Sequence, residues 1–150
     1  MDWNKVMPCA AALVFLSLLE VALIIAGYVP PVFSYSFANI AFSFSRLAVI
    51  AYCGYVNSRH GPLHCAKCGA YISLVYSLVF CAASALALLL HIPVLGMPYT
   101  GVETYAFVLA MLVVQNVALG AVVATGTAAL GGAFNRQNWA ARENRGQKKY

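Results

Sequence analysis

The sequence predicts an all-α, polytopic membrane protein in which four transmembrane helices form two hairpins that pack into one bundle. Two observations lead to this fold class. The 150 residues are 63% hydrophobic and only 9% charged, whereas a soluble domain carries about 25% charged residues. The apolar residues also gather into four long segments with short polar or proline-containing stretches between them. Such a chain cannot cover its own surface with polar groups, so the lipid bilayer must surround it.

Each apolar segment exceeds the roughly 20 residues that a helix needs to cross about 30 Å of hydrocarbon. The four segments cover about residues 6–28, 33–56, 69–90 and 103–134. Backbone groups in lipid must be bonded internally, so the segments are expected to be helices. Pro30 and Pro31 end the first segment, because proline lacks an amide hydrogen and restricts the residue before it. Residues 57–67 are expected to form a central loop, and residues 91–100 a second turn on the opposite side.

Lysine and arginine are concentrated on one side of the predicted membrane. Residues 1–134 form the expected transmembrane domain, and residues 135–150 form a basic tail. The basic residues that flank the spans are Lys5, Arg59, Lys67, Arg136, Arg142, Arg145, Lys148 and Lys149. Because positive flanks stay in the cytoplasm, we expect both termini there and the cell membrane as the location. Charge placed in this way indicates a membrane flank rather than a surface for nucleic acid, which is excluded as a partner.

Two charged residues lie inside apolar segments, Glu20 in the first and Arg46 in the second. Counted from the Pro30–Pro31 turn, they lie about ten and about fifteen residues deep, so their backbones differ in depth by roughly 7–8 Å. Helical side chains lean toward the N-terminus of their helix, and these two therefore point at each other. An unpaired charge at this depth costs a few kcal/mol. The sequence therefore predicts a Glu20–Arg46 salt bridge.

A wider polar network is expected around this pair. The second segment repeats polar residues at helical spacing on the face of Arg46, and the fourth segment has two amides near mid-depth. The predicted network contains Glu20, Arg46, Asn39, Ser43, Gln115 and Asn116. Such groups either hold the helices in register or line a path for a proton, an ion or a small solute. Because a four-helix unit is small for a pore, the second interpretation requires an oligomer.

The fourth segment also carries small residues at every fourth position. These are Gly120, Ala124, Ala128 and Gly132. Small side chains let helix backbones approach closely, so this face is expected to pack against another helix.

The central polar stretch contains a cluster of residues that can bind metal. His60, His64, Cys65 and Cys68 fall within nine residues, and Gly69 follows directly. A Cys-x2-Cys-Gly turn resembles one knuckle of a zinc ribbon, in which two thiolates bind one ion at about 2.3 Å. The second knuckle that such ribbons require is absent from this sequence.

Depth counting adds two cysteines to this cluster. Cys9 and Cys53 both lie near the predicted cytoplasmic surface and should approach each other beneath the central loop. The candidate metal residues are therefore Cys65, Cys68, His60, His64, Cys53 and Cys9, with zinc as the expected ion. The other interpretation is that the thiols are reduced and inert, because a buried free cysteine behaves as a small hydrophobe.

Four membrane helices with a Cys-x2-Cys pair resemble the quinone-coupled thiol oxidases and the relatives of vitamin K epoxide reductase. The resemblance is one of architecture, and it implies redox-active cysteines. In those families the active pairs serve the oxidising side, and a second, separated pair relays electrons. Here Cys65 and Cys68 lie on the predicted cytoplasmic side, where thiols are kept reduced, and the opposite turns contain no cysteine. Because the relay is missing, we set this assignment aside.

Signatures of catalysis are missing from the sequence. It shows no serine–histidine–acid set, no glycine-rich phosphate loop and no paired carboxylates. His91, Tyr99 and Glu103 border the second turn and are interpreted as interfacial residues. The expected function is that of a non-catalytic accessory or assembly subunit, as a homo-oligomer or within a larger membrane complex. The alternatives are a small-solute or ion pathway around Glu20 and Arg46, and a metal or thiol sensor at the central loop.

Overall fold

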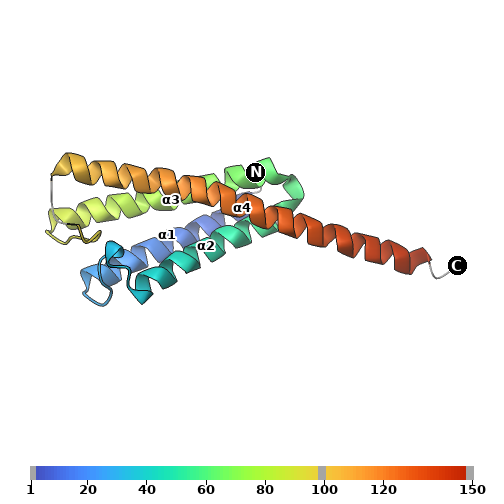
Figure 1. The fold of residues 1–150 in the computed structure, drawn as a ribbon, viewed down its shortest axis with the longest axis horizontal. Coiled ribbons are helices and arrows are strands. Elements are labelled where there is room, and N and C mark those ends of the chain that lie inside the picture. The colour runs from blue at the N-terminus through green and yellow to red at the C-terminus, as the bar shows by residue number, and fades with distance from the viewer. Residues whose placement is uncertain (1–2, 98–100, 148–150) are drawn as a thin grey trace.

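The computed structural model describes the backbone of residues 3–97 and 101–147 and the side chains of residues 3–97 and 101–132. Within these ranges the chain forms four long α-helices (Figure 1), namely α1 Trp3–Ile25, α2 Phe37–Val56, α3 Pro62–Leu89 and α4 Val102–Gln147. Each helix contains a stretch long and apolar enough to cross a membrane, and in α4 this stretch is Val102–Gly132. The predicted all-α fold class with four membrane-spanning helices is therefore confirmed.

The helices form two hairpins, α1 with α2 and α3 with α4, that lie along each other (Figure 1). The turns at residues 26–36 and 90–97 lie at the same end of the bundle, which we call the turn end. The start of α1 and the connection at residues 57–61 lie at the other end, which we call the terminal end. Helices α2 and α3 each pack against both α1 and α4. Helices α1 and α4 therefore occupy opposite corners of the bundle.

Helix α4 extends beyond the predicted span. It is continuous to Gln147, so the backbone is helical on both sides of residue 134, where the predicted tail begins. The basic side chains of the predicted tail at 135–150 lie outside the described residues.

Asn39 explains why α2 begins at Phe37 rather than at about residue 33. Its side-chain amide nitrogen lies 3.2, 2.9 and 3.4 Å from the carbonyl oxygens of Pro30, Pro31 and Val32. These bonds hold the chain in a compact turn before the helix. Ser36 is the N-cap, since its hydroxyl accepts the backbone amide of Asn39 at 3.3 Å.

Helix α3 begins at Pro62 instead of at about residue 69, so the expected loop at residues 57–67 is shorter than predicted. Gly61 precedes it with a φ of 88°, a conformation that glycine adopts without steric strain. Proline suits the first helical position because the amide hydrogen it lacks would have no partner there. Cys65 and Cys68 consequently lie on the helix and are buried in the bundle, rather than in a solvent-facing loop.

The two turns at the turn end bond to each other. The amides of Val32 and Phe33 donate to the carbonyl oxygens of Val94 and Leu95 at 2.9 and 3.1 Å. Gly96 follows with a φ of 76°, and a Cβ there would lie 2.6 Å from the Cβ of a proline in the first turn. The two hairpins are therefore joined at this end through their backbones.

Buried apolar side chains form two clusters along the bundle. The cluster near the terminal end, or terminal cluster, contains Val6, Cys9, Ala10, Leu13, Ile50, Cys53, Cys68, Ile72, Tyr76 and Ala124. The cluster near the turn end, or turn cluster, contains Val21, Ile24, Val29, Phe80, Ala87, Val94, Leu95 and Tyr105. Both draw on both hairpins, so the bundle is packed along its length.

Small residues bring α4 close to its neighbours. A Cβ on Gly69 of α3 would overlap the carbonyl oxygen of Gly120, and one on Gly54 of α2 would overlap that of Ala124. The buried positions of the predicted small-residue repeat are Gly120, Ala124 and Ala128. Gly132 differs, because a Cβ there would meet nothing within 4 Å. Close backbone approach of this kind is how helices associate in lipid.

Candidate functional site

Glu20 of α1 and Arg46 of α2 form an ion pair inside the bundle. The Glu20 side chain is 1% exposed and that of Arg46 is 14% exposed, so the pair is enclosed by protein. Depth counting from the first turn matched these two residues, and the structure joins them. Pairing is what allows both charges to lie within apolar spans.

Two aromatic rings of α3 flank the guanidinium group of Arg46. Its central carbon lies 5.8 Å from the ring centre of Tyr76 and 5.6 Å from that of Phe80. These distances are those of cation–π contacts. Tyr76 belongs to the terminal cluster and Phe80 to the turn cluster, so the ion pair lies where the two clusters meet. Three helices contribute to this site.

Several buried hydroxyl groups line the helices that form the site. Ser17 lies on α1, three residues before Glu20, and Ser73, Ser77 and Ser84 lie on α3. All four side chains are at most 1% exposed, and none of their hydroxyl groups bonds to another group in the described part of the chain. The Nε of Arg46 is also buried and has no hydrogen-bond partner among the described residues. The bundle interior therefore contains polar atoms with unused hydrogen-bonding capacity.

Asn39 and Ser43 do not take part in the predicted network. Asn39 bonds the carbonyl oxygens of the first turn, and the hydroxyl of Ser43 donates to the carbonyl oxygen of Asn39 at 3.0 Å. Their bonds are thus local to the start of α2, and neither residue forms a hydrogen bond with the ion pair among the described residues.

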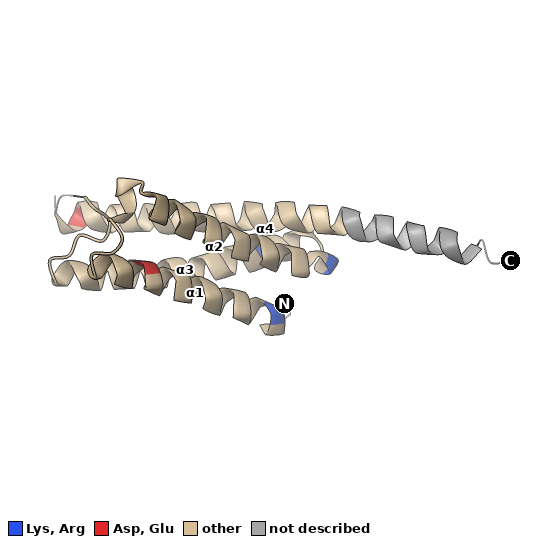
Figure 2. Cartoon of the chain, turned by 90° about the horizontal axis from the view of Figure 1, so that it is seen from below, with Lys and Arg blue, Asp and Glu red and all other residues tan. Residues whose placement is uncertain are grey.

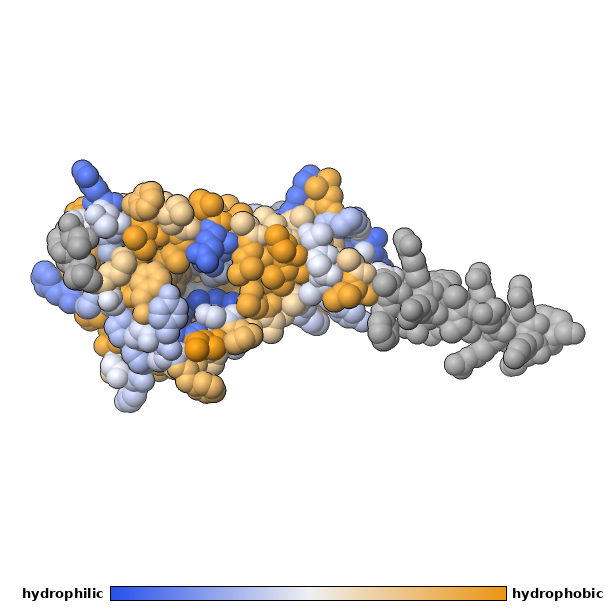
Figure 3. Space-filling model, in the orientation of Figure 1, coloured by the Kyte–Doolittle hydropathy of each residue, from blue (hydrophilic) through white to orange (hydrophobic). Residues whose placement is uncertain are grey.

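Gln115 and Asn116 form no hydrogen bond with the ion pair within the described residues. Gln115 is exposed and Asn116 is half-buried, and neither amide has a hydrogen-bond partner within the described residues. The reason is the orientation of α4. Gly120 packs toward α3, and at about 100° per residue Gln115 lies roughly 140° away from it around the helix. Figure 3 shows hydrophilic surface near mid-length of the molecule, in and beside a hollow, amid hydrophobic surface.

The thiols converge at the terminal end. Cys9, Cys53 and Cys68, from three different helices, belong to the terminal cluster, and the predicted approach of Cys9 and Cys53 occurs. Cys65 is buried beside them, and its thiol donates to the carbonyl oxygen of Asn57 at 3.2 Å. The cysteines of the described chain are all free thiols.

The predicted metal site is not assembled. Among residues 3–97 and 101–132, no group of three or more histidine, cysteine or acidic side chains is arranged to hold a metal ion. The ring centres of His60 and His64 lie 5.0 Å apart, and Cys65 and Cys68 are buried in the bundle. Helix α3 carries His64 together with Cys65 and Cys68, whereas His60 precedes the helix, and zinc binding by these residues stays a prediction.

Sequence reasoning did not assign Tyr76, Phe80 or the serines of α3 to the site. The signal was present, since Ser73, Ser77, Ser84, Tyr76 and Phe80 recur at intervals of three and four residues. The sequence alone does not show that this helix packs against the ion pair, so the spacing is equally typical of ordinary helix packing.

Comparison with known proteins gives no match: neither a protein family, nor a curated protein, nor a solved structure is similar to this chain. The class of protein therefore follows from the fold. The chain is a small multi-pass membrane protein whose bundle contains a buried ion pair.

Proposed function

We propose that the protein is a non-catalytic accessory or assembly subunit of a membrane complex and that α4 is the helix that contacts the partner. The observation that carries the proposal is the exposed amide of Gln115. It lies about thirteen residues, or roughly 20 Å, from the start of the apolar span of α4, which puts it deep in the hydrocarbon. An amide without a hydrogen bond is unfavourable there, and a second polar helix would satisfy it.

The rest of α4 supports this role. Toward the terminal end its face on the bundle is the strip of small residues, and much of its remaining surface carries large apolar side chains. Phe107 is 66% exposed, Val114 is 64% exposed and Val122 is 69% exposed. A helix that gives so little of its surface to its own bundle has most of it available for another transmembrane helix.

The ion pair favours a structural role for the bundle itself. Glu20 is almost fully enclosed, and its charge is neutralised by Arg46. The pair thus acts as a polar contact that fixes α1 against α2 at one register, while α3 holds the cation between two rings.

Both termini are proposed to lie in the cytoplasm of a cell-membrane protein. Lys5 lies at the start of α1, Arg59 in the connection before α3 and Lys67 in the first turns of α3. The turns at the other end contain no lysine or arginine (Figure 2). Single cysteines introduced at His60 and at Tyr35 test this orientation. A membrane-impermeant maleimide added outside the cell should label position 35 only, and labelling of position 60 alone would reverse the topology.

The assembly role is tested by replacing Gln115 with leucine in the full-length chain. The loss of one interhelical hydrogen bond, about 0.6–2 kcal/mol, should weaken the complex roughly 3- to 30-fold. The control is Leu78→Val at an exposed position of α3, away from the proposed face, which should leave the complex unchanged. The measurement is the distribution of complex sizes in mild detergent as a function of protein concentration. Complexes that are indifferent to both Gln115→Leu and the bulkier Gln115→Trp would refute the role of this face.

A second candidate function is a small-solute or ion pathway, formed by an oligomer around Glu20 and Arg46. The buried hydroxyl groups of Ser17, Ser73 and Ser77 favour it, because unused hydrogen-bonding groups in the bundle interior can solvate a polar solute. Flux into liposomes tests it, with Glu20→Gln as the variant and Ser45→Ala, at an exposed position of α2, as the control. Flux that Glu20→Gln leaves unchanged would eliminate this candidate.

A further inference from the structure

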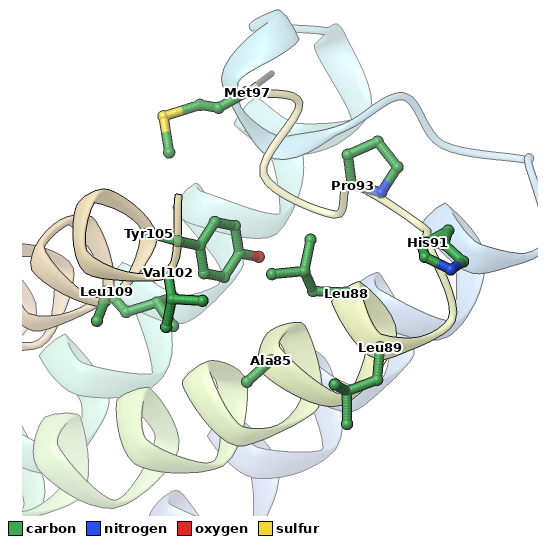
Figure 4. Close-up of a pocket in the computed structure, with 10 residues that line it drawn as sticks. Ala85, Leu88, Leu89, His91, Pro93, Met97, Val102, Tyr105 and Leu109 are labelled. Atoms are coloured by element: carbon green, nitrogen blue, oxygen red, sulfur yellow. The ribbon is translucent and has the colours of Figure 1, made fainter. Parts of the chain in front are cut away.

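A groove lies between α3 and α4 at the turn end of the bundle, away from the ion pair (Figure 4). Its volume is about 760 Å³, and it is lined by the end of α3, the turn that follows and the first turns of α4. Ligand sites in proteins commonly have volumes of about 300–1,000 Å³ and are mostly apolar. The groove therefore has the size of a binding site.

Two alanines account for the space. Ala85 on α3 and Ala106 on α4 both line the groove, and both side chains are exposed to it or to the surroundings. Leucines occupy the neighbouring lining positions, such as Leu88 and Leu109. Large side chains thus form the walls, while the alanines leave the gap between the helices open.

The polar groups of the lining are few and are placed at its edge. The hydroxyl of Tyr105 donates to the backbone oxygen of Ser84 at 3.4 Å, so it is directed at α3 and not at an occupant. His91 is the remaining lining residue with a polar side chain, and it lies in the turn beyond the end of α3 (Figure 4). The groove is accordingly apolar along its length, with an imidazole at one end.

The surroundings identify the occupant. The walls belong to membrane-spanning segments, and the lining residues Leu89 and Val102 are 76% and 70% exposed on the outside of the bundle. The medium at this depth is the acyl chains of the leaflet on the turn side, with phosphates at the level of the turn. We propose that the groove binds a phospholipid of this leaflet, with one acyl chain between α3 and α4 and the phosphate at His91. Imidazole N–H groups are suitable donors to phosphate oxygens.

The test uses the full-length protein in vesicles of phosphatidylcholine that carry a photoreactive diazirine on one acyl chain. Mass spectrometry of the labelled protein then locates the adducts. Ala85→Phe and Ala106→Phe each fill the groove, and the control is Ala118→Phe at an exposed position of α4 outside it. We expect adducts concentrated on residues 85–109, a several-fold loss in either groove variant and no change in the control. The two groove variants lie on different helices, and circular dichroism checks that each one folds. A loss of labelling in both is therefore not explained by misfolding of one variant.

Adducts spread evenly over all exposed helix faces, unaffected by both groove variants, would show ordinary boundary lipid and overturn the proposal. A disulfide between two copies of an Ala106→Cys variant in the same vesicles, together with an absence of lipid adducts on the wild-type groove, would assign the groove to protein and also overturn it. His91→Ala should lower labelling by phosphatidylcholine several-fold and leave labelling by a diacylglycerol with the same chains unchanged. Equal labelling by both lipids, in the wild type and in the variant, would show that His91 does not bind the phosphate. None of these outcomes depends on the assembly role of α4.

Discussion

Replacing one or both members of the Glu20–Arg46 pair should change the stability of the bundle in a way that the structure predicts. The variants are Glu20→Leu, Arg46→Met and the double replacement. Removing one member of a buried pair leaves the other charge uncompensated, which destabilises a protein by about 3–5 kcal/mol. Replacing both members with apolar side chains of similar volume is expected to be neutral or stabilising by about 1–4 kcal/mol. The double variant should therefore be more stable than either single variant.

The two single variants should also differ from each other. When Glu20 is removed, Arg46 keeps its contacts with two aromatic rings, each contributing about 0.5–2 kcal/mol, and it retains some exposure. When Arg46 is removed, Glu20 remains on a short side chain that is 1% exposed, and the faces of aromatic rings attract a cation but not an anion. Arg46→Met is consequently expected to destabilise more than Glu20→Leu, by roughly 1–2 kcal/mol.

Unfolding by sodium dodecyl sulfate in mixed micelles, followed by far-ultraviolet circular dichroism, measures the three free energies and gives the coupling energy of the pair. If the destabilisation of the double variant equals the sum of the two single values, the residues do not interact and the site is misassigned. If Glu20→Leu is the more damaging change, the aromatic support of Arg46 is refuted while the pairing itself stands.

Three further replacements test how the hairpins are joined, each by the same unfolding measurement. Gly69→Ala should destabilise by about 1–3 kcal/mol because its methyl group overlaps the facing backbone of α4, whereas Gly126→Ala, with nothing within 4 Å, should be neutral or mildly stabilising. Gly96→Ala should be worse than Gly27→Ala, since both have positive φ but only the first also collides with the other turn. Asn39→Asp should cost about 1–3 kcal/mol because it replaces a donor with a carboxylate among carbonyl oxygens. Equal stability within either glycine pair, or an unaffected Asn39→Asp variant, would contradict the corresponding contact.

The fold class and the ion pair follow from physical constraints that act on every membrane chain. The lengths of the hydrophobic segments determine how many times the chain crosses the membrane. The prolines of the first turn give a common reference point from which depth along the first two helices is counted. Once depth is known, the lean of helical side chains is enough to match Glu20 with Arg46. Both arguments are local to one hairpin and need no knowledge of how the hairpins pack.

The errors arose where rotation about a helix axis or a loop boundary mattered. Gln115 was assigned to the ion pair by depth alone, but the small-residue face of α4 turns it outward. Cys65 was placed in the loop at residues 57–67 because its surroundings are polar, although Gly61 followed by Pro62 is a helix-start signal. Depth along a helix can be read from sequence, whereas the direction a residue faces depends on which neighbour packs where.

The surrounding bilayer explains why a small number of contacts determines which helices of this bundle pack together. Lipid chains are as apolar as leucine, so burying apolar side chains between helices gives little net drive to associate. The ion pair, the close glycine contacts and the bonded turns must therefore define which helices meet and at what register. All of these contacts lie within the four-helix unit. The Gln115 amide, which is also unfavourable in lipid, lies on the outer surface of the unit. A polar group on another transmembrane helix would satisfy this amide, and the assembly role that we propose rests on that argument.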